Sequence, residues 1–277
     1  MSGGEGDRYV LGHAPEELAR LERQAAIFEA PTRALLQRCG IGPGQRVLDL
    51  GCGAGDVSLL VADLVGPGGE VIGVDRAAEA VAIARERAAG QGRRHVTFVH
   101  SAIEALDLAP VDAVVGRFVL MHQASPESAL RHAAQWVRPG GAVAVMESHL
   151  DALGPGWHSY PPSAAYANLL DVMLRTIRAA GGRPDMGLRL RATFLDAGLP
   201  DPAIDVYGTL AGLDAARLCH YMADSLRSMA AMADELGVAT LPPARIDEME
   251  RGMLADAVRP GAVMNGPLVV TAWARLP

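Results

Sequence analysis

The chain has 277 residues, half of them hydrophobic, and a formal net charge of −7 from 25 basic and 32 acidic side chains. A net negative chain without a basic cluster argues against nucleic acid as a partner. No apolar run approaches the roughly 18 residues of a membrane-spanning helix, so we expect no membrane segment. The length suits one large core, and we expect a single domain with insertions over residues 1–277.

The cysteines, histidines and first residues predict neither a metal site nor a secretory signal. Cys39, Cys52 and Cys219 are odd in number and lack the paired spacing of a disulfide framework or a zinc site. The eight histidines are scattered, without a His-x-x-x-His pair. The first seven residues contain no basic region followed by an apolar one. We therefore expect a cytoplasmic protein without a bound metal.

Residues 1–40 are predicted to form an N-terminal arm with two helices. The first helix begins at Pro15 and is expected to end at Pro31, because proline cannot make the backbone hydrogen bond of a helix interior. A second, short helix is expected over residues 32–39. The cofactor-binding core would then follow over residues 41–148.

A glycine-rich turn lies between a buried strand and a helix. The apolar residues of 47–50 predict the strand, and a helix begins near Val57. Between them stand Gly51, Gly53 and Gly55. Glycine suits this place because a side chain would keep the backbone away from a ligand, and because such turns often require positive φ.

An acidic residue stands at the end of the next strand. Val71, Ile72 and Val74 predict that strand, which ends on Asp75, 20 residues after Gly55. A carboxylate at this place can accept hydrogen bonds from both hydroxyls of a ribose. The glycine turn and Asp75 together indicate a nucleoside-containing cofactor.

Two further carboxylates help to identify that cofactor. A dinucleotide fingerprint starting at Gly51 would need glycine at position 56, where Asp56 stands. A carboxylate at a helix start is also a poor host for a pyrophosphate, which makes a nicotinamide oxidoreductase the weaker alternative. Asp49 can face an ammonium group while the amides of the turn take a carboxylate. A ligand with ribose, ammonium and carboxylate but no phosphate is S-adenosylmethionine.

The rest of the chain continues the alternation of strands and helices. Further strands are predicted over 96–99, 111–118, 142–146 and 203–207, with a final antiparallel strand over 269–272. Two helical insertions, 149–186 and 211–262, leave and rejoin the sheet at its ligand edge. We expect them to form a lid.

The motifs resemble those of a known class of proteins. The sequence from Asp49 to Gly55 resembles the glycine motif of the class I methyltransferases. The turn at 138–141, Arg-Pro-Gly-Gly, together with the loop around His122, resembles the small-molecule group that includes quinone-biosynthesis and natural-product tailoring enzymes. The resemblance covers about residues 9–150. It implies an α/β fold with a Rossmann-like seven-stranded mixed sheet, helices on both faces, S-adenosyl-L-methionine as cofactor and S-adenosyl-L-homocysteine as product.

The resemblance also implies cofactor contacts outside the glycine motif. Tyr9 and Gln24 would touch the methionine end of the cofactor, since Tyr-Val-Leu-Gly-His at 9–13 resembles an arm that folds over it. Relatives often use an aspartate for the adenine amino group where this chain has Ala102, so backbone groups near Ala102 and Ile103 would serve instead. The expected cofactor-binding residues are Tyr9, Gln24, Asp49, Gly51, Gly53, Gly55, Asp75, Arg76, Ala102, Ile103 and Arg117.

Three side chains are candidates for catalysis: His122, Glu147 and Tyr166. His122 and Glu147 follow strands at the edge where ligands bind in such sheets. In methyl transfer most of the acceleration comes from holding nucleophile and methyl group in register, and a base is needed only when the acceptor must lose a proton. The alternatives are that His122 packs on the cofactor, that Glu147 pairs with an arginine, and that Tyr166 belongs to the lid core rather than stacking on a substrate.

The aromatic and methionine side chains of the lid favour a small apolar or aromatic acceptor, as in secondary metabolism. Relatives that methylate indole C3 carry a similar Tyr-Val-Leu-Gly-His arm, which favours C-methylation of an indole-type ring. O- or N-methylation, and a module that binds cofactor without catalysis, remain open. We expect a monomer or homodimer.

Overall fold

The computed structural model describes residues 15–152, 158–208, 210–212 and 214–277. The helices are α1 (Pro15–Arg38), α2 (Asp56–Val65), α3 (Ala78–Gly90), α4 (Pro126–Ala134), α5 (Ala164–Ala179), α6 (Met186–Asp196), α7 (Ala215–Glu235) and α8 (Pro243–Ala257). Short 3₁₀ turns are η1 (Ile103–Ala105), η2 (Leu120–His122) and η3 (Leu150–Ala152).

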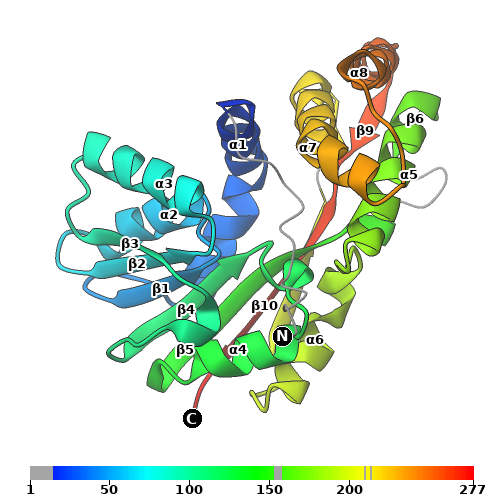
Figure 1. Ribbon diagram of the computed structural model, residues 1–277. Helices are drawn as coiled ribbons and strands as arrows, with labels where there is room; N and C mark the ends of the chain where they lie inside the picture. Colours follow the sequence, from blue (N-terminus) through cyan, green and yellow to red (C-terminus); the bar gives the residue numbers. More distant parts are fainter. Residues whose placement is uncertain (1–14, 153–157, 209, 213) are drawn as a thin grey trace, which may run out of the picture.

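A seven-stranded mixed sheet forms the centre of the molecule (Figure 1). Its strands are β1 (Arg46–Leu50), β2 (Glu70–Asp75), β3 (Val96–His100), β4 (Val111–Arg117), β5 (Val137–His149), β7 (Ala203–Tyr207) and β10 (Leu268–Arg275), in the order β3-β2-β1-β4-β5-β10-β7. The strands from β3 to β5 are parallel, while β10 runs antiparallel to β5 and β7. The predicted α/β fold with an antiparallel final strand is confirmed.

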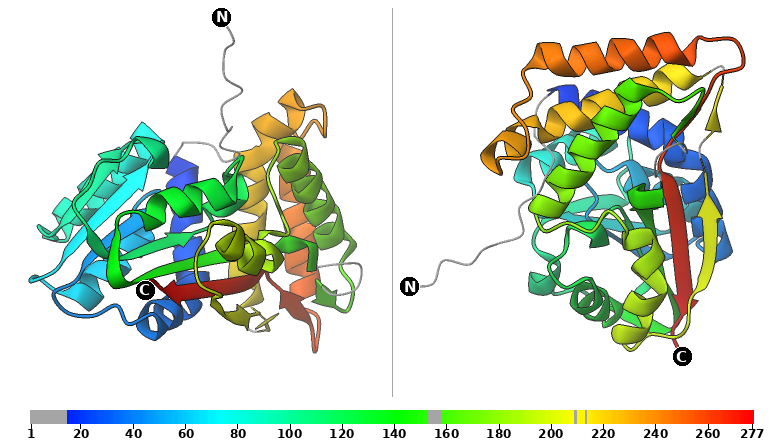
Figure 2. Two further views of the ribbon diagram at one scale, coloured as in Figure 1. Left: turned by 90° about the horizontal axis from the view of Figure 1, so that it is seen from below. Right: turned by 90° about the vertical axis from the view of Figure 1, so that its right-hand side faces the viewer.

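Helices cover both faces of this sheet, so its central strands are apolar on both sides. Helices α1, α2 and α3 lie on one face, and α4 and α6 on the other (Figures 1 and 2). Val47 and Leu48, neighbours that point to opposite faces, are both completely buried. Strands buried on both faces form continuous apolar runs, as the β1 sequence does.

A second group of helices stands at the edge formed by the carboxyl ends of the parallel strands. Helices α5, α7 and α8 pack on one another, and α7 also contacts α1. A small sheet of β6 (Ser159–Tyr160), β9 (Val263–Asn265) and β8 (Leu210–Ala211) borders this group. We refer to α5, α7 and α8 as the lid helices; they fall within the two insertions expected from the sequence.

Helix α1 differs from the sequence-based prediction, which was wrong to end a helix at Pro31. The helix continues through Pro31 to Arg38. Proline removes one backbone hydrogen bond, but burial of Phe28 and Leu35 holds the helix against the core on both sides of that point. The hydroxyl of Thr32 also donates to the carbonyl of Phe28 at 2.6 Å.

Strand β5 is longer than predicted and includes the Arg-Pro-Gly-Gly segment. That segment was expected to be a turn before the strand. Instead Gly140 donates its amide to the carbonyl of Leu276 at 3.0 Å, and the amide of Leu276 donates to Gly141 at 2.8 Å. Pairing with the end of the chain therefore draws the segment into the sheet. Within the described residues, no helix is long and apolar enough to span a membrane.

Candidate functional site

The glycine turn connects β1 to α2 and is wound as the sequence predicts. Gly51, Gly53 and Gly55 have φ of 60°, 51° and 86°. A Cβ on Gly51 would stand 2.7 Å from the side chain of Val119, so this glycine is also required by packing. A Cβ on Gly53 would meet nothing within 4 Å. The turn thus lies against the β4 side of the sheet at Gly51 and leaves open space at Gly53.

Asp75, at the end of β2, fixes the same turn from the side. Its Oδ2 accepts the amide of Gly53 at 2.9 Å, and its Oδ1 accepts the amide of Ala77 at 2.8 Å. Each carboxylate oxygen can accept about two hydrogen bonds. Asp75 therefore orders the turn and keeps capacity for the two hydroxyls of a ribose.

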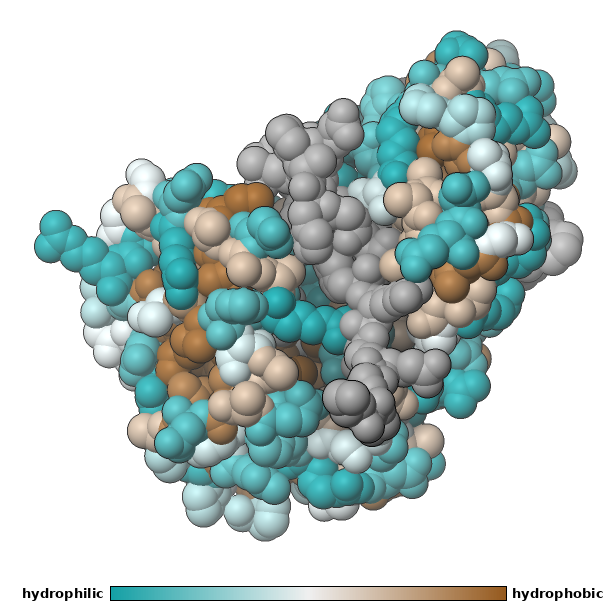
Figure 3. Space-filling view, in the orientation of Figure 1, coloured by the Kyte–Doolittle hydropathy of each residue, from teal (hydrophilic) through white to brown (hydrophobic). Residues whose placement is uncertain are grey.

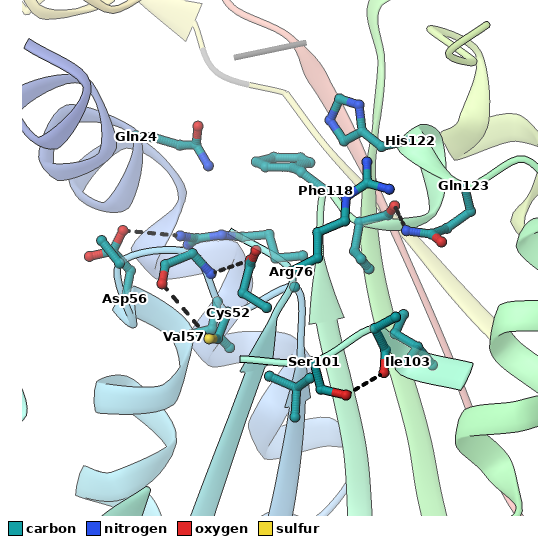
Figure 4. A pocket seen from close by; sticks show the side chains of 18 of the residues that line it. Gln24, Cys52, Asp56, Val57, Arg76, Ser101, Ile103, Phe118, His122 and Gln123 are labelled. Atoms are coloured by element: carbon teal, nitrogen blue, oxygen red, sulfur yellow. Dashed lines mark hydrogen bonds and ion pairs between the residues drawn. The ribbon is translucent and has the colours of Figure 1, made fainter. Parts of the chain in front are cut away.

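The turn borders a cavity of about 150 Å³, which we call the glycine-loop cavity. Among the predicted cofactor residues, those that line it are Gln24, Gly51, Gly53, Asp75, Arg76, Ala102, Ile103 and Arg117. Figure 4 shows side chains from α1, the glycine turn and the loop after β4 gathered around this space. Gly55 does not line it, and Tyr9 lies outside the described residues.

The predicted contact between Asp49 and the cofactor is not observed. Its side chain is buried behind the turn and does not line the cavity, so it does not face a ligand there. Oδ2 accepts the hydroxyl of Ser58 in α2 at 2.6 Å, while Oδ1 has no hydrogen-bond partner within the described part of the chain. The shortness of the turn brings α2 directly over the carboxylate, which sequence spacing does not reveal. Burial raises the pKa of Asp49 to about 7.

Asp56, at the start of α2, is held by two arginines. Its carboxylate lies 2.8 Å from Arg87 and 3.8 Å from Arg117, and its side chain is almost buried. The buried Arg117 also donates to the hydroxyl of Thr32 in α1 at 3.3 Å. This helix N-terminus is therefore occupied by a paired carboxylate, which supports the exclusion of a pyrophosphate ligand.

A second cavity, of about 80 Å³, lies between the sheet edge and the lid helices; we call it the lid cavity. It shares Arg20, Gln24, Phe118 and His122 with the glycine-loop cavity. Its other walls come mainly from α5 and α7 and include Met173, Ile177, Tyr221, Met222, Ser225 and Met229. Figure 3 shows the lid helices as a lobe beside the sheet, with hydrophobic and hydrophilic residues mixed on its surface. The methionines at helical spacing thus line a cavity as well as filling the core.

An aromatic row runs along one side of the lid cavity. The rings of Phe28 and Phe118 meet edge to face, with centroids 5.1 Å apart at 77°. Phe28 meets Tyr221 in the same way at 5.9 Å and 79°. All three residues line the lid cavity, so α1, α7 and the end of β4 together give it an aromatic wall.

His122 is the predicted catalytic residue that the structure brings to both cavities. It ends η2, and its side chain lies beside the Phe118 ring (Figure 4). Burial, followed by the charges of Arg76 and Arg20, lowers the pKa of His122 to about 4. The imidazole is therefore neutral near pH 7 and can accept a hydrogen bond or a proton, although it is a weak base.

Glu147 does not reach either cavity, so the sequence-based prediction that it acts as a base is not supported. It is completely buried and lines neither cavity. Its Oε1 accepts the amides of Val119 and Leu120 at 2.9 and 2.7 Å, and its Oε2 accepts the amide of Met121 at 3.4 Å. The loop after β4 folds back over this carboxyl group and separates it from the cavities. Burial raises the pKa of Glu147 to about 8.

Tyr166 also differs from its predicted role and belongs to the lid core. It is buried, and it lines neither cavity. Its hydroxyl donates to the carbonyl of Asn265 at 2.8 Å, which ties α5 to β9. Its ring meets that of His158 edge to face at 5.5 Å. The alternative considered from the sequence, a structural tyrosine, is the one observed.

Several cavity residues escaped the sequence analysis. Arg20 and Phe118 line both cavities, and Glu104 and Gln123 line the glycine-loop cavity. Arg20 lies four residues before Gln24 in α1 and donates to its side-chain oxygen at 2.7 Å, so the helical spacing from Gln24 could have indicated it. No group of three or more potential metal ligands occurs among the described residues.

The pH dependence of stability follows from the two buried carboxyl groups. Asp49 and Glu147 keep their protons in the folded chain at pH values where the unfolded chain has released them. Their stabilising contribution is complete below about pH 4 and is lost as pH rises through 7 to 8. The free energy of unfolding in urea should therefore fall by about 2 kcal/mol between pH 6.5 and 8.5.

Burial also raises the pKa of Cys39, Cys52 and Cys219, and these thiols add a smaller fall in stability near the upper end of this pH window. His122, whose pKa is lowered, loses its stabilising contribution as pH falls from 6.5 towards 4, below the window. The Asp49→Asn variant should reduce the slope. A free energy of unfolding that rises with pH across the window would contradict the assignment.

The fold and the site agree with those expected of a class I S-adenosylmethionine-dependent methyltransferase. Residues 41–169 match the family model described as a methyltransferase domain, and this segment contains β1 to β5 with the glycine turn and Asp75. A methyltransferase domain is thereby confirmed over residues 41–169, as predicted from the sequence, with S-adenosyl-L-methionine as its methyl donor.

Comparison with individual proteins agrees with this domain family. The chain is 30% identical over 193 residues to an uncharacterized 37.1 kDa protein in transposon TN4556 of Streptomyces fradiae, covering 69% of this chain and 54% of that protein. It is 34% identical over 118 residues to the ubiquinone/menaquinone biosynthesis C-methyltransferase UbiE of Ectopseudomonas mendocina, covering 42% of this chain and 46% of that protein. The chain thus spans about half the length of these relatives.

A solved structure supports the fold independently of sequence. The crystal structure of a putative methyltransferase from Bacillus halodurans matches with a TM-score of 0.57 at 17% identity, over 90% of this chain and 99% of that one. At this identity the match concerns the fold alone.

Proposed function

We propose that this protein transfers a methyl group from S-adenosyl-L-methionine to a small, apolar, aromatic acceptor held in the lid cavity. The observation that carries the proposal is the junction of two cavities. The glycine-loop cavity has the groups for the cofactor, and the lid cavity shares four residues with it. A methyl donor in one and an acceptor in the other would meet at Phe118 and His122.

The residues of the glycine-loop cavity fit the cofactor. The open space at Gly53 admits a ligand close to the backbone, and Asp75 has lone pairs available for ribose hydroxyls. Ala102 and Ile103 line the same cavity, and their backbone groups are the proposed partners of the adenine. When bound, the cofactor supplies an electrophilic methyl group on a sulfonium.

The chain's own contribution is to position the acceptor and exclude water. The aromatic row and the methionines would hold a flat apolar ring. His122 is neutral and can accept the proton of the acceptor, or orient it by a hydrogen bond. Because its basicity is low, the site suits an acceptor that is already nucleophilic, such as an electron-rich ring.

We favour a ring carbon as the methylated atom, as in an indole-type acceptor of secondary metabolism. Support comes from the aromatic wall, from the lack of Asp or Glu among the described residues that line the lid cavity, and from the likeness to a relative named as a C-methyltransferase. Transfer to oxygen or nitrogen remains the alternative within the same proposal.

A label-transfer assay tests the proposed function. The protein would be incubated with S-adenosyl-L-methionine labelled in the methyl group and with panels of indoles, phenols and amines. Label on an indole or another electron-rich carbon supports the proposal, and label only on phenols or amines moves the methylated atom to oxygen or nitrogen. Cofactor binding without transfer to any panel member would favour a non-catalytic binding module.

The role of His122 predicts a particular pH profile. The acid limb of kcat/KM for the acceptor should fall near pH 4 rather than near 6.5, because only the neutral imidazole accepts a proton. His122→Gln should lower kcat about 10-fold or more and leave the affinity for S-adenosyl-L-homocysteine nearly unchanged. Rates measured from pH 4 to 8 check this. An acid limb near pH 6.5 that persists in His122→Gln would assign the proton acceptor elsewhere.

A further inference from the structure

We propose that Glu147 is a positioning residue, which holds the turn over residues 118–122 so that the Phe118 ring stands at the boundary of the two cavities. The role of that ring in acceptor choice rests on the proposed function. The holding of the turn does not, and it can be tested without any acceptor.

Phe118 has an unfavourable backbone conformation. With φ of 56°, it is the one residue other than glycine in the left-handed region among the residues that the structure describes. This region is disfavoured for L-residues with a Cβ by about 5- to 30-fold in equilibrium terms. Such conformations persist only where the surroundings enforce them, and they cluster at functional sites.

Two sets of hydrogen bonds enforce this conformation, one made by Phe118 itself and one by the residues directly after it. Its own amide donates to the carbonyl of Met146 at 2.9 Å, which continues the ladder between β4 and β5. Directly after it, three consecutive amides converge on the carboxyl group of Glu147 at 2.9, 2.7 and 3.4 Å. The chain must therefore turn sharply at Phe118 to leave the strand and reach Glu147.

The turn determines where the Phe118 ring and His122 lie in the site. It places the Phe118 ring edge to face with Phe28, and it places the ring and His122 in the linings of both cavities. In Figure 4 the ring lies between the side chains of Gln24 and His122. Without the carboxyl group, the backbone at Phe118 could relax to negative φ and move the ring off this boundary. Glu147 would then determine acceptor choice through Phe118.

The first test compares two variants that both lack the ring. Phe118→Ala keeps a Cβ and hence the cost of positive φ, whereas Phe118→Gly does not. At an ordinary loop position alanine is the more stable of the two. Here the absence of a Cβ favours glycine by about 5- to 30-fold, while the chain entropy favours alanine by about 2- to 5-fold. We therefore expect the unfolding constant of Phe118→Gly in urea to be about 4-fold smaller than that of Phe118→Ala. The opposite order would show that the backbone is not strained.

The second test measures whether the hydrogen bonds to Glu147 maintain the positive φ of Phe118. The same pair is measured in a Glu147→Ala background, where the unfolding constant of Phe118→Ala divided by that of Phe118→Gly should fall to 1 or below, as at an ordinary loop position. In Glu147→Gln, which keeps the oxygen bonded by Val119 and Leu120, it should fall at least twofold but stay above 1. If Glu147→Ala does not fold, the Glu147→Gln pair decides the question. An unchanged ratio in either background overturns the proposal.

The chain offers a matched control on the same strand. Asp112 lies at the opposite end of β4, is nearly buried, and accepts the amide of Arg46 at 2.7 Å. Asp112→Ala also removes a buried carboxylate that binds a backbone amide. It should lower stability without changing the ratio at position 118.

Activity supplies a readout that a purely structural role would not move. Phe118→Gly and Glu147→Gln should both change the relative kcat/KM of large and small acceptors, and the double variant should go little beyond Phe118→Gly, because both act through one ring. Additive effects would assign Glu147 a separate role. If no acceptor is ever methylated while the stability ratios behave as expected, the proposed function fails and the positioning of Phe118 stands.

Discussion

Replacing Asp75 with alanine is expected to lower the affinity for S-adenosyl-L-homocysteine by about 100-fold or more. A hydrogen bond to a charged group contributes about 1.5 to 3 kcal/mol, and the variant loses two such bonds to the ribose. It also releases the amides of Gly53 and Ala77, which the carboxylate holds in place. Calorimetric titration with S-adenosyl-L-homocysteine measures the effect directly.

Two further variants make this result specific. Asp75→Asn keeps one acceptor oxygen, and its affinity for S-adenosyl-L-homocysteine should lie between those of the parent and the alanine variant. Asp63→Ala removes a surface carboxylate from the neighbouring helix α2, where it pairs with Arg93, and should leave the affinity unchanged. An Asp75→Ala protein that binds within threefold of the parent would mean that the ribose is held by other groups.

The largest loss of stability is expected for Glu147→Ala. Three backbone amides in the core would lose their acceptor, at about 1 to 3 kcal/mol for each buried unsatisfied group, and a cavity would replace the side chain. We expect the free energy of unfolding to drop by about 4 kcal/mol or more, and the Tm by about 10 °C or more. Urea titration and thermal melts check both values.

Comparison with milder changes separates the causes of this loss. Glu147→Gln retains an oxygen at the same place and should lose less than half as much. Glu248→Ala removes an exposed glutamate that pairs with Arg245 on the surface of α8, and should change stability by less than about 0.5 kcal/mol. If Glu147→Ala were as mild as Glu248→Ala, the three amides must find other partners.

The fold and the position of the glycine-loop cavity were predictable because they depend on short-range features. The strand, glycine turn and helix from Arg46 to Val65 are contiguous in sequence, and Asp75 ends the neighbouring parallel strand. Apolar runs and glycine positions therefore identify both the sheet and its ligand edge. The same reasoning placed His122 at that edge.

Glu147 and Tyr166 show where this reasoning stops. Each residue lies in the strand or helix that the sequence predicts, but its hydrogen-bond partners are distant in sequence. The amides that donate to Glu147 are 26 to 28 residues away, and the carbonyl bonded by Tyr166 is 99 residues away. A pattern of residue types cannot tell whether a loop folds over a side chain or leaves it open. Asp49 fails in the same way, since only the three-dimensional path of the turn places it behind α2.

Some residues line only the lid cavity and others line both cavities, and this difference affects how the range of acceptors can evolve. Met173, Met222 and Met229 line the lid cavity without lining the glycine-loop cavity, whereas Arg20, Gln24, Phe118 and His122 line both. Substitutions at the methionines can reshape one ligand's space while the other ligand's contacts persist. Substitutions at the four shared positions alter both at once. Diversification within related enzymes, and libraries built from this chain, should therefore concentrate on α5 and α7.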